Sequence, residues 1–325
     1  MRNRRLIATI TTSAFIAAIL IAPSIAAGNS NGKSPNENAI GYWTKDRLDN
    51  ALTRDFEFEP GAKSGKLVSL GKSARGGGGK TTSITGSSWT KGGKPLLATG
   101  KVFFTMSAKN YVCSGSIVNE SASDRSIVLT AGHCVFDNAT GNFATRFIYI
   151  PAFDTTPVTD CNVSRCLEAT SLVAHNGFTS EGSFTTKATQ YDWGFASIPE
   201  SGINGFSLNT TTFTNSSTSY AFGYPAGRPY GGKDLVYCAG PISPDANNGG
   251  LTWGLGCNMT GGSSGGPWLA AFNTTTFDGS ASSLNSYGYG TNSTKMYGPK
   301  FNTSTLSTFE AAKIVPTATA TAVVN

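Results

Sequence analysis

From about residue 95 onward, the chain consists of short apolar runs separated by clusters of Gly, Asn, Ser or Pro. The runs are rich in Val, Ile, Phe and Tyr, and their spacing predicts β-strands in a sandwich or barrel rather than alternating strands and helices. The expected strands are Lys101–Met106, Tyr111–Val118, Ser126–Thr130, Arg146–Ile150, Thr170–Ala174, Trp193–Ile198, Ser219–Phe222, Leu235–Cys238, Trp268–Phe272 and Ser286–Tyr289. A single helix is expected over Thr305–Ile314, before Pro316. The sequence therefore predicts an all-β domain.

Composition agrees with this interpretation and excludes several classes of protein. Hydrophobic residues make up 39% of the 325 residues, which is enough for a core and argues against general disorder. The charge of +6 comes from the front of the chain, because residues 1–94 carry 14 Lys+Arg against 6 Asp+Glu, whereas residues 95–325 carry 11 against 13. The main domain therefore offers no net positive charge to a nucleic acid, and we expect none as a partner.

Residues 1–26 resemble a secretory signal peptide. Arg2, Arg4 and Arg5 precede an apolar stretch that is interrupted by threonines, and Ser24 and Ala26 are placed like an A-x-A cleavage site. The alternative is a single membrane anchor, but the stretch is short for one. We expect a secreted, extracellular protein that has no membrane contact after the signal is removed.

Residues 27–94 differ in composition from the rest and are interpreted as a propeptide and linker. They are rich in Asn, Gly, Lys and Ser, include one amphipathic stretch over 42–51, and contain a Gly76–Gly79 run that predicts flexibility. The alternative is an N-terminal extension that stays attached. The domain itself is expected over 95–325.

Six cysteines in an exported chain predict disulfides rather than a metal site. They allow 15 pairings, of which we expect the sequential one: Cys113–Cys134, Cys161–Cys166 and Cys238–Cys257. No CxxC occurs, and His133 and His175 are the only histidines, so no metal or other cofactor is expected. Nine N-x-S/T sequences indicate an exposed, loop-rich surface that is open to glycosylation; they begin at Asn119, Asn138, Asn162, Asn209, Asn215, Asn258, Asn273, Asn292 and Asn302.

A histidine motif ends one of the apolar runs. In Leu129-Thr130-Ala131-Gly132-His133-Cys134, small residues allow a tight turn that leaves the imidazole uncovered. A general base needs this kind of fixed placement. His175 precedes Asn-Gly and lacks the tight turn, so it is interpreted as a surface-loop histidine.

A serine in a glycine turn forms a second motif, Gly261-Gly262-Ser263-Ser264-Gly265-Gly266-Pro267-Trp268. Glycines on both sides let the Ser264 hydroxyl project and let backbone N–H groups point into one small space. A nucleophilic serine needs both features, and the N–H groups of Gly262 and Ser264 are the expected oxyanion donors. A Gly/Ser surface loop is the alternative, but Pro267-Trp268 leads into a core strand.

An acidic residue opens a third apolar run, in Gln190-Tyr191-Asp192-Trp193-Gly194. A buried carboxylate is costly unless it is paired. A hydrogen bond to an imidazole N–H would satisfy Asp192 and fix the histidine tautomer. The alternative is an exposed aspartate at the start of a strand.

These motifs, in the order His133, Asp192, Ser264, resemble the chymotrypsin-like serine peptidases over roughly residues 95–312. The resemblance implies two six-stranded antiparallel β-barrels, about 95–198 and 199–312, with the active site between them and a short C-terminal helix. The Met259–Ser264 run and Tyr297-Gly298-Pro299 are similar to the secreted microbial trypsin-like and glutamyl-endopeptidase branch.

The resemblance also implies substrate-binding positions. Ser286, Tyr287 and Gly288 resemble the segment that pairs with substrate, and Asn258 stands where trypsins carry the Asp that selects Lys or Arg. Asn285 replaces the histidine of glutamyl endopeptidases, so neither specificity is expected. Ser263 replaces the Asp that pairs with a new N-terminus in animal trypsin-like enzymes, so a propeptide must act differently here.

The predicted function is therefore a secreted serine endopeptidase that acts on polypeptides, as a monomer, through an acyl-enzyme. One alternative is a catalytically inactive homologue that acts as a binding or adhesion protein. A structural or carbohydrate-binding β-protein is a third class, but the five tryptophans do not cluster as a binding platform would need.

Overall fold

The computed structural model describes residues 25–27, 38–59, 61–68, 83–122, 124–154, 161, 165–211, 213–290, 293–314 and 321–325. Most of the predicted signal peptide, the Gly76–Gly79 run and the sequons at Asn162 and Asn292 lie outside these ranges. No helix in the described ranges has the length and apolar character that crossing a membrane requires.

The first sheet contains six of the longer strands and forms the first barrel. Its strand order is β1-β23-β13-β14-β8-β7-β6-β11-β12, and β2 pairs with β7. The six strands are β6 (Thr99–Met106), β7 (Lys109–Val118), β8 (Arg125–Thr130), β11 (Thr145–Pro151), β13 (Ser171–His175) and β14 (Gly194–Pro199). Pairing among them is antiparallel throughout. Most of their residues are buried on both faces, as strands of a filled barrel are.

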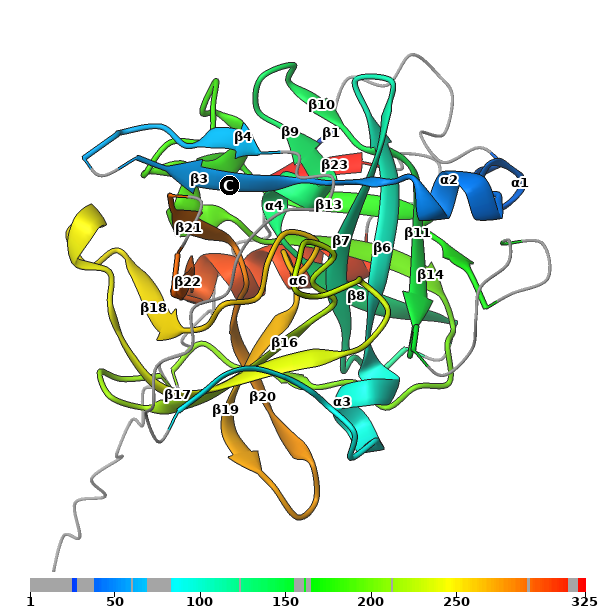
Figure 1. The fold of residues 1–325 in the computed structure, drawn as a ribbon. Helices are drawn as coiled ribbons and strands as arrows, with labels where there is room; N and C mark the ends of the chain where they lie inside the picture. The colour runs from blue at the N-terminus through cyan, green and yellow to red at the C-terminus, as the bar shows by residue number, and fades with distance from the viewer. Residues whose placement is uncertain are drawn as a thin grey trace, which may run out of the picture.

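The second sheet forms the second barrel. Its order is β15-β20-β19-β16-β17-β18-β22-β21-β3-β4, and β5 pairs with β17. Six of its longer strands are β16 (Thr218–Gly223), β17 (Val236–Pro244), β18 (Thr252–Gly256), β19 (Pro267–Asn273), β20 (Asp278–Leu284) and β22 (Lys295–Pro299). The two sheets lie side by side (Figure 1). This architecture is the all-β, two-barrel fold that the sequence predicts.

Short elements connect these strands. Among them are four two-residue strands, β9 (Phe136–Asp137), β10 (Asn142–Phe143), β12 (Leu167–Glu168) and β15 (Ser207–Leu208), and the three-residue strand β21 (Tyr287–Tyr289). The short helices are α3 (Gly93–Ala98), α4 (Gly132–Val135), α5 (Asn176–Thr179), η1 (Ala188–Tyr191) and η2 (Ala246–Asn248).

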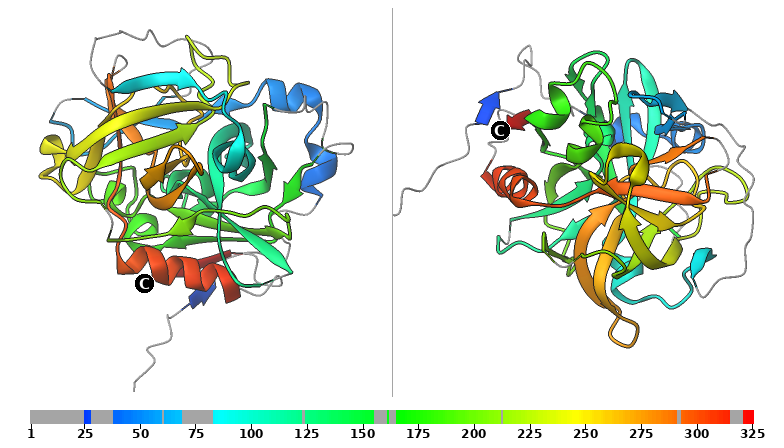
Figure 2. Two further views of the ribbon diagram at one scale, coloured as in Figure 1. Left: turned by 90° about the horizontal axis from the view of Figure 1, so that it is seen from below. Right: turned by 90° about the vertical axis from the view of Figure 1, so that its left-hand side faces the viewer.

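The predicted C-terminal helix is present as α6 (Thr303–Ile314), but it packs on the first barrel. The Ser197 hydroxyl donates to the carbonyl of Ala312 over 2.7 Å, and the rings of Phe195 and Phe309 lie 5.6 Å apart. Strand β23 (Thr321–Val324) then adds to the first sheet in parallel with β13. The end of the chain therefore returns to the first barrel, where Figure 2 shows α6 on the outside of the sheet.

The N-terminal region is folded onto the barrels over the part that the structure describes. It contains β1 (Ile25–Ala27), α1 (Ala39–Tyr42), α2 (Lys45–Asp49), β2 (Leu52–Thr53), β3 (Asp55–Phe58), β4 (Lys66–Val68) and β5 (Ile84–Ser88). The amphipathic stretch over 42–51 begins at the end of α1 and contains α2, and Trp43 between the two helices is completely buried. Trp89 packs in the core as well, so the structured unit includes residues ahead of the predicted domain start at 95.

Three disulfides form, with the pairing expected from the sequence. Cys113–Cys134 joins β7 to α4, Cys161–Cys166 closes a short loop, and Cys238–Cys257 joins β17 to the segment after β18. No cysteine in the described ranges is free.

Candidate active site

His133 lies in α4, the single turn that follows β8. A glycine suits position 132, because a Cβ there would lie 3.1 Å from Asp192 Oδ1 and 3.2 Å from the ring of Phe178, which is closer than most Cβ contacts. The imidazole is completely buried. The turn therefore fixes the position of His133. The expectation of an uncovered imidazole was wrong, because the rings of Phe56 and Phe184 lie against it.

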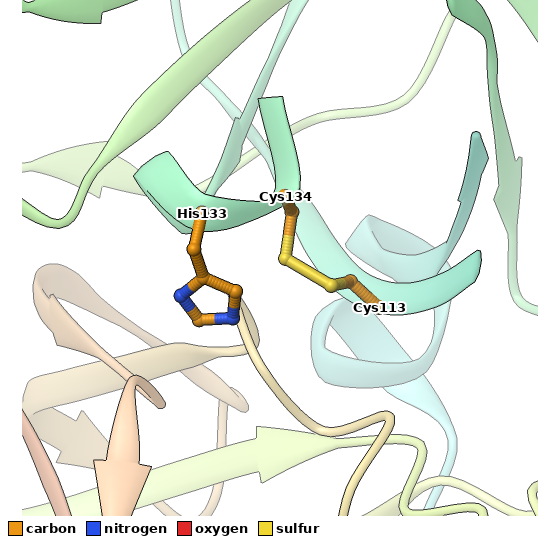
Figure 3. A group of neighbouring side chains, drawn as sticks. All are labelled: Cys113, His133 and Cys134. Atoms are coloured by element: carbon orange, nitrogen blue, oxygen red, sulfur yellow. A yellow bond between two sulfur atoms is a disulfide. The ribbon is translucent and has the colours of Figure 1, made fainter. Parts of the chain in front are cut away.

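The Cys113–Cys134 disulfide lies beside the imidazole and ties the turn to β7 (Figure 3). The two sulfur atoms and the ring nitrogens are close enough together to suggest a metal site. However, thiolates are the cysteine form that binds metals, and both sulfurs are bonded to each other. The disulfide therefore has a mechanical role here, which is to brace the histidine turn.

Asp192 follows η1 and precedes β14, and it is completely buried. Its Oδ2 lies 2.8 Å from His133 Nδ1, and its Oδ1 accepts a 2.8 Å hydrogen bond from the His133 backbone N–H. The hydroxyl of Ser286 also donates to Oδ2. These contacts satisfy the buried carboxylate and favour the tautomer with the proton on Nδ1, which leaves Nε2 as the acceptor.

Ser264 lies in the glycine turn before β19. Gly262 and Gly265 adopt φ values of +94° and +85°, which disfavour any other residue. A Cβ on Gly265 would also lie 2.2 Å from Thr130 Oγ1 and 2.4 Å from the Ser114 carbonyl oxygen. The glycines therefore allow this turn to approach the strand that leads to His133.

Two sets of hydrogen bonds hold the Ser264 turn. From the first barrel, Ser114 N–H donates to the Ser264 carbonyl over 2.7 Å, and the Ser114 hydroxyl donates to the Gly262 carbonyl over 2.8 Å. From the second barrel, Asn285 Nδ2 donates to the Ser263 carbonyl over 3.0 Å. Asn285 is completely buried and accepts a bond from the Trp268 indole, so it acts as a clamp on the turn.

The contact between His133 and Ser264 is not formed. His133 Nε2 has no hydrogen-bond partner among the described residues. The Ser264 hydroxyl instead donates to Asp55 Oδ1 over 3.0 Å, and the Gly262 N–H donates to the same oxygen over 3.3 Å. A carboxylate of the N-terminal region therefore occupies the position between the predicted nucleophile and a predicted oxyanion donor.

Burial raises the pKa of Asp55, and desolvation is the largest cause. The nearby His133 and the hydrogen bonds from Ser264 and Gly262 act in the opposite direction. The carboxylate is thus held where its charge is costly, by the groups that would otherwise meet a substrate.

Asn258 contacts the N-terminal region too. Its side-chain oxygen accepts a 2.5 Å hydrogen bond from the Tyr230 hydroxyl, and its N–H donates to the Thr85 carbonyl over 2.8 Å. A Cβ on Gly86 would collide with both Asn258 and Tyr230. Strand β5 therefore runs directly against the predicted base of the specificity pocket.

The Ser286–Gly288 segment contacts Asp192 through the Ser286 hydroxyl, and its β21 part pairs with β3. The hydroxyls of Tyr287 and Tyr289 both donate to Asp245 Oδ2, over 2.7 and 2.8 Å. Asp245 is buried, and burial raises the pKa of Tyr287 and Tyr289. The hydrogen bonds to Asp245 therefore hold β21 in place through its two tyrosines.

His175 is buried and lies at the end of β13, so the prediction of a surface-loop histidine was wrong. Its Nδ1 accepts a 2.9 Å hydrogen bond from Gly177 N–H, and its ring stacks on Tyr191 with centroids 4.8 Å apart. The Asn-Gly sequence that suggested a loop is the start of helix α5, which His175 caps.

Three residues at this site, Arg54, Asp55 and Phe56, were not predicted from the sequence. The available signal was the alternation of polar and aromatic residues in Asp55-Phe56-Glu57-Phe58, which is the period of a half-buried strand. The low-complexity sequence around it concealed that signal.

No protein-family model and no curated protein matches the chain. Solved structures do match. The protease Anisep from Arthrobacter nicotinovorans is 34% identical, with a TM-score of 0.60, and the match covers 70% of this chain and 99% of Anisep. The thermostable serine protease AL20 from an extremophilic microorganism is 31% identical, with a TM-score of 0.58, over 68% of this chain and 99% of AL20. A Glu endopeptidase shares the fold at 18% identity, with a TM-score of 0.53, over 71% of this chain and 98% of that one. The chain therefore belongs to the chymotrypsin-like serine proteases, in their microbial branch.

Proposed function

We propose that the chain is a secreted serine endopeptidase that uses Ser264 as nucleophile, His133 as general base and Asp192 as the group that orients the base. The observation that carries the proposal is the buried His133–Asp192 pair, whose Nε2 is left as a free acceptor, together with a serine in a fixed glycine turn. The homology to serine proteases and the three disulfides support the reaction class and an oxidising compartment.

In this mechanism, Ser264 Oγ attacks the scissile carbonyl carbon while His133 Nε2 takes the hydroxyl proton. The N–H groups of Gly262 and Ser264 stabilise the oxyanion. The C–N bond then breaks as His133 returns the proton to the leaving amine, and an acyl-enzyme forms on Ser264. Water, deprotonated by His133, hydrolyses this ester and regenerates the serine.

A fluorophosphonate that reacts with activated serines tests the assignment. The enzyme secreted by its producing cells should be labelled, and peptide mass analysis should place the label on Ser264. The Ser264→Ala protein should not be labelled. An unlabelled wild-type protein that also fails to cleave casein would support the inactive homologue instead.

We also propose that Asn258 disfavours Lys and Arg before the scissile bond, because a neutral amide cannot neutralise a buried cation. Asp278, an acid that could have replaced it, already pairs with Lys94 over 3.0 Å. Matched peptides that differ only at this residue test the idea. A preference for Arg or Lys of about a hundredfold, which is about 2.7 kcal/mol, would mean that another acid, such as Asp234, reaches the pocket.

It follows that the Asn258 sequon stays unglycosylated, since a glycan would fill the pocket. Residues 1–26 retain their proposed role as signal. Within the proposed propeptide and linker of 27–94, we assign the propeptide role to the part ahead of β5, because Trp89 packs in the core. We propose that the processed enzyme is a monomer that acts on polypeptides.

A further inference from the structure

We propose that residues 52–58 are an inhibitory segment, which binds the active site of its own chain and places the Asp55 carboxylate where a scissile carbonyl would react. The same peptide, supplied free, is then a ligand of the processed enzyme. This inference rests on the proposed function.

The group that faces Ser264 is the carboxylate of Asp55. Asp55 Oδ1 accepts hydrogen bonds from the Ser264 hydroxyl and from the Gly262 N–H. Donors arranged for an oxyanion suit an ionised carboxylate, which carries its negative charge in the ground state, whereas a scissile carbonyl develops that charge only during the reaction. The carboxylate carbon is a poor electrophile and has no amine to expel, so the segment occupies the donors without offering a bond to cleave.

The hydroxyl proton of Ser264 points toward Asp55 and not toward His133. In the proposed mechanism this proton must pass to His133 Nε2. Here the hydroxyl donates to Asp55, and Nε2 has no partner in the part of the chain that the structure describes. The bound segment therefore interrupts the contact that activates the nucleophile.

The backbone of the segment pairs with strands of both barrels. Strand β2 pairs with β7 at Tyr111 and Val112, and β3 pairs with β21 over its whole length, from Tyr287 to Tyr289. Adding a strand to a sheet edge is a common way to bind an extended peptide. Strand β21 includes Tyr287 and Gly288, the positions expected to pair with substrate, so segment and substrate compete for the same edge. Figure 1 shows β3 running beside β21 and across the region of α4.

The residues on either side of Asp55 also contact the site through their side chains. The Arg54 guanidinium donates to Asp137 Oδ1 over 3.0 Å and to the His133 carbonyl over 2.8 Å, and its side chain is only 4% exposed. Phe56 stacks on Phe184 with centroids 4.1 Å apart and meets the His133 ring edge-on at 5.4 Å. The segment thus contacts the site through three consecutive side chains of its own: Arg54, Asp55 and Phe56. Together they cover the His133 imidazole from solvent.

Labelling of the unprocessed full-length chain with a fluorophosphonate tests the segment in place. The unprocessed band, identified by mass, should react slowly in the wild type. Asp55→Ala should raise the labelling rate at least about tenfold, because it removes a charge-assisted hydrogen bond to the nucleophile. Arg54→Ala should also raise the rate. Glu59→Gln is the matched control: it removes an equal charge just after β3 at an exposed position, and the rate should not change.

Equal labelling of the unprocessed wild-type and Asp55→Ala chains would overturn the inhibitory role. Because the processed wild-type enzyme is labelled in parallel, failure of this proposal can be told apart from failure of the proposed function. In the latter case neither processed nor unprocessed protein reacts.

A free peptide that spans residues 50–60 provides a second measurement that does not depend on folding of a variant. Added to the processed wild-type enzyme, it should inhibit competitively, so that the apparent KM rises and kcat stays constant. The peptides with Asp55→Asn or Arg54→Ala should bind at least about tenfold more weakly, and the Glu59→Gln peptide should match the parent. Absence of inhibition, or cleavage of the peptide as a substrate, would contradict the proposal.

Discussion

The His133–Asp192 side and the Ser264 side of the site differ in how they are assembled. In the first barrel, His133 and Asp192 are completely buried and hydrogen-bonded to each other. Ser264 is held in an equally fixed turn beside the second barrel, but its hydroxyl is hydrogen-bonded to Asp55 from the N-terminal region. The proposed base is therefore fully oriented, whereas the proposed nucleophile is hydrogen-bonded to the N-terminal region.

This difference shows which part of the reactivity is built into the barrels. Orientation of the base depends on contacts between residues of one barrel and Ser286, and it persists with the segment in place. Engagement of the nucleophile depends on a segment more than 200 residues away in sequence. Removing that segment would free the Ser264 hydroxyl and the Gly262 N–H and would end the contacts of Arg54 and Phe56 with His133. The hydrogen bonds between His133 and Asp192 do not involve the segment. The following substitutions separate the two sides.

The largest effect is expected for Ser264→Ala. Losing the hydroxyl removes the covalent route, and turnover of the processed enzyme should fall on the order of 10⁶-fold, as removal of the triad serine or histidine does in subtilisin. His133→Ala should be about as severe. Steady-state kinetics on a peptide substrate measure the loss, and thermal unfolding checks that the fold is kept.

The matched control is Ser263→Ala, the preceding residue. Its hydroxyl is buried but has no hydrogen-bond partner among the described residues, so activity should be retained. If Ser264→Ala kept more than about a tenth of the activity, the assignment of the nucleophile would be wrong.

A smaller loss is expected for Asp192→Asn, which disturbs the assembled side alone. The amide can donate to His133 Nδ1 and so favours the wrong tautomer, and kcat should fall by about 10⁴-fold. Ser286→Ala removes only one of the hydrogen bonds to Asp192, so a loss of about tenfold is expected. Equal losses for the two variants would argue against a role of Asp192 in fixing the tautomer.

Much of this arrangement could be predicted from local sequence. Nine of the ten expected strands match the observed ones within about two residues, because each is an apolar run that ends in turn-forming residues. Strand β17 extends six residues beyond the expected end at Cys238, and β18, β20 and β22 were not predicted. The sequence motifs also placed His133, Asp192 and Ser264 correctly near strand ends. The sequential disulfide pairs follow from pairing between neighbouring elements, such as β7 with the turn after β8.

The parts that were missed depend on contacts between distant segments. Gly/Asn/Ser-rich sequence around β3 suggested a linker, and no local pattern reveals that Asp55 meets Ser264 or that Arg54 pairs with Asp137. Helix α6 was predicted, but its packing on the first barrel depends on contacts such as that of Phe309 with Phe195. The burial of His175 likewise depends on Tyr191, which approaches it through the fold.

The next prediction concerns the brace of the histidine turn. Replacing Cys113 and Cys134 by Ala together opens a loop with a sequence separation of 21, and the free energy of unfolding should fall by about 3 kcal/mol. Replacing Cys161 and Cys166, which are 5 residues apart, should cost less, about 2 kcal/mol. Urea unfolding in the Ser264→Ala background avoids self-digestion. The Cys113 and Cys134 pair should also reduce kcat when tested with Ser264 intact, whereas the short-loop pair should not.

The smallest effect is expected for the pH dependence of stability, through His175. Burial lowers the pKa of His175, so the folded protein holds this ring neutral while the unfolded chain binds a proton below a pH of about 6.5. The free energy of unfolding should therefore fall as the pH drops through that value. In His175→Asn, the side-chain oxygen can still accept from Gly177 N–H, but the position no longer titrates. The decrease in stability between pH 8 and pH 5 should be smaller in the variant, measured by urea unfolding in the Ser264→Ala background. An identical decrease in both proteins would mean that His175 is as easily protonated in the folded state as in the unfolded chain, and that its capping of α5 places no cost on its charge.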